Sequence, residues 1–303
     1  MKPVNVTLQL GSQAPLTPPE SDFYYVDQGN YQTFVLADTP LTAYSDSATS
    51  CIITTVFCTS PSGNTLIVAH LDSPACIEAF FALPQLGAAS SLQVFAQGAN
   101  PPDNSTAKAN AAQLQACIDQ LGSRVSNHEL ILLQGDPREQ NRGEFGVHYA
   151  GDGSACVSNQ PYSLALYQRD PTCGGQTVYC IMRRQEQPPV QLRDAGQPFS
   201  HPELVELASI ALAFRKDPQD PASAFCNIVN LQDAEIRANW STTPAYEAPW
   251  FSDQLKLGAT FALAMAPVVT LSAQHLLSHT PPSFTRLRQA LLSPRSANGQ
   301  EAP

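Results

Sequence analysis

CIITTVFC (51–58), TSPSG (59–63) and NTLIVAH (64–70) are the consecutive segments of this 303-residue chain that decide its fold. The first and third are runs of β-branched and apolar residues, and the connection between them contains Pro and Gly. Two such runs joined by a short turn predict an antiparallel β-hairpin.

Cys51 is the first residue of the predicted hairpin and His70 is its last. Side chains alternate between the two faces of a strand, so a loop with an even number of residues places both on one face. A two-residue loop puts them directly opposite. A four-residue loop over 60–63 makes them diagonal neighbours, with Cβ atoms roughly 7 Å apart or less.

Further strand and helix signals flank the hairpin. Strands are predicted at 4–10, 23–28, 31–37, 91–97, 129–134, 144–150, 163–168 and 176–182. Helices are predicted from Ser105 or Thr106 to about Leu121, over 201–216, and over 249–266 with Ser252 as the cap. These elements predict one α+β domain over 1–280, followed by a partly disordered tail, 281–303.

The composition limits the class of partner. A formal charge of -10 and a pI near 4.9 argue against nucleic acid or an anionic membrane surface as the main partner, and suit a cationic ligand such as a free amino terminus. No run approaches the roughly 18 to 20 apolar residues of a membrane span, and the first 25 residues lack signal-peptide features. We therefore expect a cytoplasmic protein.

Eight cysteines without a C-x-x-C pair predict reduced thiols. Cys51 stands out because the polar segment 44–50 precedes it, which predicts a partly exposed thiol where a solvated loop enters the sheet. A nucleophilic thiol needs a nearby base, and His70 is the candidate. From the spacing alone, a buried strand cysteine is an equally good interpretation.

Other polar motifs point less clearly to chemistry. Ser45 and Asp46 either orient the imidazole, bind substrate or cap a loop. Asp72 either faces the same site or begins the next loop. His275 and His279 share a helix face but lack a nearby acid motif, so surface positions are favoured over zinc ligation, and His148 is expected to be structural. No Walker loop, dinucleotide fingerprint or G-x-S-x-G elbow occurs.

The segment SDSATSC (45–51), the Ser-Gly-Asn turn and LIVAHLDS (66–73) resemble motifs of the protein N-terminal asparagine amidohydrolases. The similarity continues through GDPREQNRGEFGVHYAGDGSA (135–155) and, more faintly, APWFSDQLKLGATFALAM (248–265). Two departures are Ser47 for the second Asp of the family's S-D-D and Ser73 for the Gly of its H-x-D-G.

The Cys-then-His order is also similar to that of chemotaxis-receptor glutamine deamidases and cytotoxic-necrotizing-factor toxins. These relatives imply a layered sandwich of mostly antiparallel sheets flanked by helices. They also imply Cys51 as nucleophile, His70 as acid/base partner, and Ser45 at the position of a threonine that assists the histidine in the chemotaxis enzymes.

The resemblance implies a cysteine amidohydrolase that converts an N-terminal asparagine of a peptide or protein to aspartate and ammonia through a thioester. Such an enzyme needs neither a metal nor an organic cofactor. Asp46, Asp72 and Glu144 are then candidates to bind the substrate's ammonium group.

Two alternatives remain open. One is a glutamine deamidase or transglutaminase acting on an internal residue of a folded protein, delivered to a host cytosol if the source is a bacterial pathogen. The other is a binding protein that kept the fold and lost the activity.

Overall fold

The computed structural model describes residues 2–186, 188–213 and 225–265. Two compact units divide the chain. The first comprises Met1–Pro171, Gln191–Pro198 and Gln232–Ser252, and the second comprises the described parts of Thr172–Val190, Phe199–Leu231 and Asp253–Pro303.

Two mixed β-sheets form the first unit. The six-stranded sheet has the order β11-β3-β6-β5-β7-β8, and the five-stranded sheet has the order β1-β10-β9-β4-β2. The strands of the first are β11 (Arg193–Asp194), β3 (Asn30–Val35), β6 (Gly63–Leu71), β5 (Ile52–Ser60), β7 (Ser91–Gly98) and β8 (Val125–Leu132). Those of the second are β1 (Asn5–Gln9), β10 (Ser154–Ser158), β9 (Phe145–Tyr149), β4 (Leu41–Ser45) and β2 (Phe23–Tyr25).

The central strand β5 is buried on both faces, which explains its continuous apolar sequence. Ile53 and Phe57 pack between the sheets, against Phe145 and Val147 of β9. The alternate side chains, among them Ile52 and Val56, pack under helices on the opposite face. Fully burying an apolar side chain of this size contributes roughly 1.5–3 kcal/mol.

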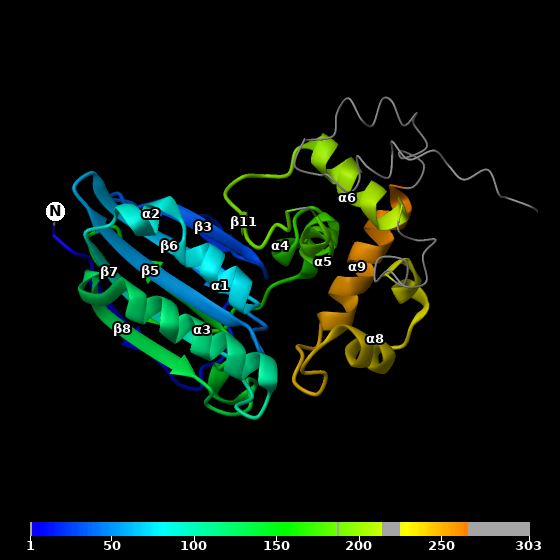
Figure 1. The fold of residues 1–303 in the computed structure, drawn as a ribbon, viewed down its shortest axis with the longest axis horizontal. Helices are drawn as coiled ribbons and strands as arrows, with labels where there is room; N and C mark the ends of the chain where they lie inside the picture. Colours follow the sequence, from blue (N-terminus) through cyan, green and yellow to red (C-terminus); the bar gives the residue numbers. More distant parts are fainter. Residues whose placement is uncertain (1, 187, 214–224, 266–303) are drawn as a thin grey trace, which may run out of the picture. The chain divides into compact units, whose positions relative to one another are not determined.

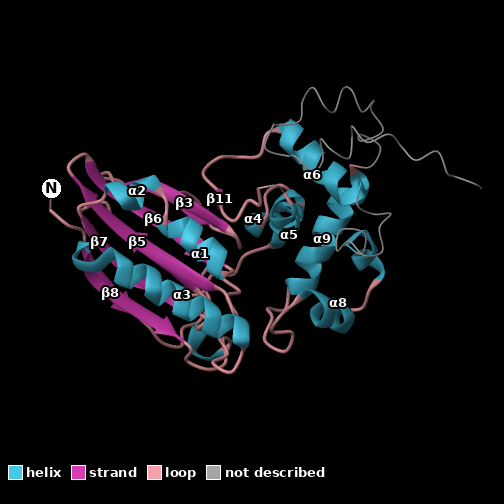
Figure 2. Cartoon of the chain, viewed as in Figure 1, coloured by secondary structure: helices cyan, strands magenta, loops and turns pink. Residues whose placement is uncertain are grey.

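Three of the helices of the first unit cover the outer face of the six-stranded sheet, as Figures 1 and 2 show. They are α1 (Pro74–Phe81), α2 (Pro84–Ala88) and α3 (Ser105–Leu121). Ser73 caps α1 by accepting from the Cys76 amide at 3.2 Å. The unit is therefore an α+β sandwich with a helix layer, a six-stranded sheet and a five-stranded sheet, which confirms the predicted fold class.

The remaining elements complete the described chain. They are α4 (Leu166–Arg169), α5 (Gly175–Met182), α6 (His201–Ala213), α8 (Asp233–Trp240) and α9 (Phe251–Ala264), with short 3-10 turns η1 (Gly122–Arg124), η2 (Glu139–Asn141), η3 (Arg183–Gln185) and η5 (Cys226–Asn230). In the second unit α5 packs against α6.

Two predicted strands are wrong in type. Residues 163–168, expected as a strand, form a loop and most of α4. Residues 176–182, also expected as a strand, belong to α5. In α5, Val178, Tyr179 and Met182 are buried with helical spacing, a pattern that a short apolar run does not distinguish from a strand.

Two caps also differ from the prediction. Asn104, not Ser105 or Thr106, caps α3 by accepting from the Ala107 amide at 3.0 Å. Ser252 lies inside α9, where its hydroxyl donates to Asp233 Oδ1 at 2.5 Å.

The single domain over 1–280 stays a prediction, because part of that range is not described. The predicted tail, 281–303, lies outside the described residues, as do His275 and His279.

Candidate active site

The β5–β6 hairpin fixes the relation between Cys51 and His70. Ser60 pairs with Gly63, and Ile53 pairs with His70. Cys51 directly precedes β5, so in this register His70 lies diagonally across from it and on the same face. The predicted shared face is confirmed. Because Ser60 and Gly63 pair, the loop has only two residues, 61 and 62, but Cys51 and His70 are not directly opposite: the register is the one expected for a 60–63 loop, with the two Cβ atoms roughly 7 Å apart or less.

Ser45 reaches this face from the other sheet. It ends β4, where it pairs with Phe145 of β9, and its Oγ is hydrogen-bonded to His70 Nδ1 at 2.8 Å. Ser45 is 0% exposed and His70 is 3% exposed. Because this bond engages Nδ1, proton exchange between His70 and a thiol has to use Nε2.

The predicted partly exposed setting of Cys51 is wrong. Cys51 is only 8% exposed, and all of 44–50 is buried except the half-buried Ser47. Residues up to Ser45 form a strand instead of a solvated loop. The polar character of the segment therefore reflects buried hydrogen bonds and not contact with water.

Main-chain hydrogen bonds fix the turn before Cys51. The amide of Ala48 donates to the Gly143 carbonyl at 3.0 Å, and the amide of Asn100 donates to the Thr49 carbonyl at 2.8 Å. The buried side chain of Asn110 donates to the Ser50 carbonyl at 2.8 Å. Sequence reasoning missed Asn110, although an Asn on the apolar face of helix α3 is a recognisable signal.

Gly98 lets β7 approach the backbone of Cys51. Its φ is +139°, and a Cβ placed on it would lie 2.2 Å from the Cys51 carbonyl oxygen. That oxygen accepts from the Ala99 amide at 2.7 Å. Glycine is therefore required here for both conformation and space.

A segment distant in sequence also holds the turn. Thr243 Oγ1 and Thr49 Oγ1 are hydrogen-bonded at 2.7 Å, and Ser50 Oγ and Thr242 Oγ1 lie 3.1 Å apart. Thr243 Oγ1 also lies 3.1 Å from Oε1 of Glu247. Burial raises the pKa of Glu247, while hydrogen bonds from Ser241 and Thr243 act against that rise. Nothing in the local sequence signalled these contacts.

Asp46 forms a buried ion pair. Its Oδ2 lies 2.6 Å from Nη2 of Arg169, and the two side chains are 1% and 3% exposed. The Tyr25 hydroxyl donates to Asp46 Oδ1 at 2.9 Å. The guanidinium of Arg169 lies over the Trp250 ring, 3.9 Å from its centroid. The negative charge of Asp46 is thus already compensated within the protein.

Asp72 follows β6 and stands across from Cys51 when the register is extended by one pair. It is 9% exposed, and the Gln28 side chain donates to its Oδ2 at 3.0 Å. That its carboxylate faces the Cys51–His70 site, and does not simply begin the next loop, stays a prediction.

Glu144 lies just before β9 and faces a different environment. Burial raises the pKa of its carboxyl to about 7, and the nearby charge of Asp46 adds to the effect. Among the residues that the structure describes, no hydrogen-bond partner reaches its buried Oε2 atom. Gln97, which pairs with Ile53 across β5 and β7, fixes the backbone here by donating to the Glu144 carbonyl at 2.7 Å.

Asp46 and Glu144 both line a cavity of about 480 Å³. Its other lining residues are Pro15, Tyr44, Pro161, Tyr162, Ser163, Leu164, Arg169 and Trp250. Cys51, His70 and Ser45 do not line it. Since Ser45 faces His70, alternation along β4 directs Tyr44 to the other face of the five-stranded sheet. The cavity lined by Tyr44 and the Ser45–His70 contact therefore lie on opposite faces of β4.

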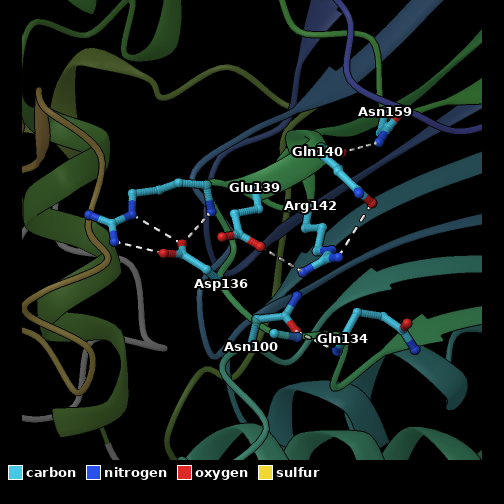
Figure 3. A network of polar contacts seen from close by, with 9 residues as sticks. Asn100, Gln134, Asp136, Glu139, Gln140, Arg142 and Asn159 are labelled. Atoms are coloured by element: carbon cyan, nitrogen blue, oxygen red, sulfur yellow. Dashed lines mark hydrogen bonds and ion pairs between the residues drawn. The ribbon is translucent and has the colours of Figure 1, made fainter.

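The loop that carries Glu144 is held by the polar network of Figure 3. Asn100 Oδ1 accepts from the amides of Gln134 and Gly135 at 2.7 and 3.2 Å. Farther along, Asn159 donates to the Gln140 carbonyl at 2.7 Å, and Arg142 Nη1 lies 3.7 Å from Glu139 Oε2. These contacts tie the loop before Glu144 to the rest of the first unit.

His148 and the cysteines other than Cys51 are the remaining residues that the sequence analysis considered. His148 is exposed on β9, and its Nδ1 lies 3.1 Å from Thr42 Oγ1. The eight cysteines are all free thiols. Burial raises the pKa of Cys58 to about 11, which fits its expected role as core. Within the described ranges, no group of three His, Cys, Asp or Glu side chains could hold a metal ion.

No protein-family model matches this chain, and no curated protein matches its sequence. The likeness to the N-terminal asparagine amidohydrolases therefore remains a resemblance in short motifs. None of the helices described here is both long and apolar enough to cross a membrane.

Proposed function

We propose that the protein is a cysteine amidohydrolase that deamidates a side-chain carboxamide, with the amino-terminal asparagine of a peptide or protein as its substrate. The observation that carries this proposal is the placement of His70 between two partners. It is hydrogen-bonded to Ser45 at 2.8 Å and shares a strand face with Cys51. A thiol, an imidazole and a group that orients the imidazole are the parts that nucleophilic catalysis requires.

In the proposed reaction, the Cys51 thiol transfers its proton to His70 and the thiolate sulfur attacks the carboxamide carbon. Backbone amides of the Ser50–Cys51 turn stabilise the oxyanion. His70 then protonates the leaving nitrogen, the C–N bond breaks, ammonia leaves and a thioester remains. A water molecule deprotonated by His70 hydrolyses the thioester, which yields a carboxylate and regenerates the thiol.

Ser45 acts as a positioning residue in this scheme. Its hydroxyl holds Nδ1 of His70 in a fixed position, because both side chains are almost fully buried. A fixed imidazole presents its second nitrogen in one direction, which is what proton transfer to and from a sulfur on the same face requires.

The test is ammonia release from peptides that carry Asn or Gln, at the amino terminus or internally. Cys51→Ala should remain folded and lose turnover. Cys58→Ala is the matched control, because Cys58 lies on β5, which Cys51 directly precedes, but packs on the opposite face of the sheet. Normal turnover by Cys51→Ala, or equal loss in both variants, would refute the nucleophile assignment.

One observation favours the internal-glutamine alternative. Asp46, the carboxylate nearest in sequence to Ser45, is already paired with Arg169 and cannot take up a substrate ammonium without losing that ion pair. Faster ammonia release from an internal Gln than from an amino-terminal Asn would establish this alternative.

A further inference from the structure

Asn110 supplies the one side-chain donor among three consecutive hydrogen bonds at the Cys51 turn. Its Nδ2 atom donates to the carbonyl of Ser50 at 2.8 Å. The carbonyls immediately before and after that of Ser50 accept from the backbone amides of Asn100 and Ala99, at 2.8 and 2.7 Å. A substitution can therefore remove the donor of the middle peptide group while the two backbone donors stay in place.

The middle peptide group joins Ser50 to Cys51, so its N–H belongs to the proposed nucleophile. A peptide group is planar and almost always trans, so its C=O and N–H point in opposite directions. Because the Ser50 carbonyl points to Asn110 on α3, the N–H of Cys51 points away from that helix. The hydrogen bond from Asn110 therefore fixes the direction of the Cys51 N–H.

The side away from α3 is the side of the proposed chemistry. Helix α3 lies on the outer face of the six-stranded sheet (Figure 1), whereas the Cys51 side chain packs between the two sheets with Ile53. In the tetrahedral intermediate the former carboxamide carbon is bonded to Sγ of Cys51, which keeps its oxyanion close to the N–H of the same residue. A hydrogen bond to the carbonyl of a peptide group also polarises its N–H and makes it a stronger donor to the oxyanion.

The surroundings of Asn110 do not explain its polar side chain by packing. Asn110 is 0% exposed, and its neighbours on the buried face of α3 include Ala107, Ala111 and Leu114. Among the residues that the structure describes, its Oδ1 atom has no hydrogen-bond partner. A buried amide with one unsatisfied atom is costly, and residues that break a local rule in this way are expected at functional sites. Packing alone would favour an apolar residue at this position.

We propose that Asn110 is a positioning residue, which fixes the Ser50–Cys51 peptide group so that the Cys51 N–H stabilises the oxyanion of the deamidation. The inference rests on the proposed function and names the side chain that holds its oxyanion donor in place. Since the oxyanion forms only after the sulfur attacks, loss of Asn110 should lower kcat and leave KM nearly unchanged. Removing an oxyanion donor outright costs about 100-fold to 1,000-fold, so loss of the residue that directs it should cost roughly 10-fold to 100-fold.

The experiment replaces Asn110 by Leu in the full chain and measures ammonia release from an Asn-peptide, with urea unfolding of each variant. Leu114→Ala is the matched control, because Leu114 lies one turn along the same buried face and its truncation destabilises the fold without removing a hydrogen bond at Ser50. We expect Asn110→Leu to lose roughly 10-fold to 100-fold in kcat, with KM within twofold of the native value. Leu114→Ala should keep a kcat within twofold of the native value.

Alkylation by iodoacetamide separates the oxyanion site from the nucleophile. The thiolate displaces iodide from the CH2 carbon, so a C–S bond forms, a C–I bond breaks and no oxyanion arises. The alkylation rate of Cys51, followed by mass spectrometry of its peptide, should therefore stay within twofold of the native value in Asn110→Leu.

Asn110→Asp is the conservative variant, and it keeps the test available if Asn110→Leu does not fold. A protonated carboxyl group can donate to the Ser50 carbonyl, whereas an ionised one cannot. The kcat of Asn110→Asp relative to that of the native chain should therefore fall as the pH rises.

The positioning role would be overturned by a kcat of Asn110→Leu within twofold of the native value, or by equal losses of turnover and alkylation. Equal kcat losses in Asn110→Leu and Leu114→Ala would overturn it in favour of packing, and so would a relative kcat of Asn110→Asp that does not change with pH. A native chain without ammonia release dependent on Cys51 would overturn the proposed function, and this inference with it.

Discussion

Replacing Ser45 by Ala removes the hydrogen bond that orients His70. The two atoms are 2.8 Å apart, and the side chains are 0% and 3% exposed, so water cannot take the place of the lost hydroxyl. A buried polar atom left without its partner costs about 1–3 kcal/mol. If the transition state carries this full cost, kcat falls between about 5-fold and 150-fold, since each 1.36 kcal/mol is a factor of ten.

The assay is ammonia release under saturating peptide, accompanied by urea unfolding of each variant. Ser45→Thr keeps the hydroxyl and should retain more activity than Ser45→Ala. Ser47→Ala is the control, because Ser47 lies two residues away and donates to Asp46 Oδ1 at 3.1 Å instead of to His70. A kcat for Ser45→Ala within twofold of the native value, in a folded protein, would refute the positioning role.

Three further predictions concern stability and the nucleophile's backbone. Arg169→Met leaves the charge of Asp46 buried without its partner and should lower the free energy of unfolding by about 3–5 kcal/mol in urea titrations, whereas adding Asp46→Asn should restore part of the loss. The pKa of Glu144 is raised to about 7 from an ordinary 4.5, so the folded state holds the proton more tightly than the unfolded state does. Between pH 4.5 and pH 7 the free energy of unfolding should therefore fall as the pH rises, by on the order of 2–3 kcal/mol. Urea titrations from pH 4.5 to 8 should show this decline in the native chain and not in Glu144→Gln. Gly98→Ala would place a methyl group 2.2 Å from the Cys51 carbonyl oxygen. This substitution should lower the free energy of unfolding by about 1–3 kcal/mol, and it should lower kcat more than it changes KM. A variant as stable as the native chain would contradict the close approach.

Local sequence patterns predicted the elements with long, regular signals. The hairpin, the helix over 105–121 and the strand over 91–97 formed where they were expected. Short segments were less predictable. Strand β4 was missed because its sequence LTAYS, at 41–45, is largely small and polar, and α5 was taken for a strand because its apolar residues form a continuous run.

Part of the candidate site was likewise predictable from the sequence, and part of it was not. Cys51 and His70 belong to one hairpin, so the two-residue period of a strand was enough to predict that they share a face. The burial of Cys51 was not predictable from the polar residues before it. Their partners, Asn110 and Thr243, come from α3 and from a segment almost 200 residues along the chain.

The sequence by itself therefore determined the α+β class and the shared face of Cys51 and His70, because both follow from periodicity within short stretches of chain. Only the tertiary structure decided that Ser45 contacts His70 from the second sheet, that Arg169 neutralises Asp46 from 123 residues away, and that Glu144 lines a separate cavity. These contacts depend on how two sheets and their loops pack. Packing brings together residues with no fixed spacing, so no local pattern encodes which of them meet.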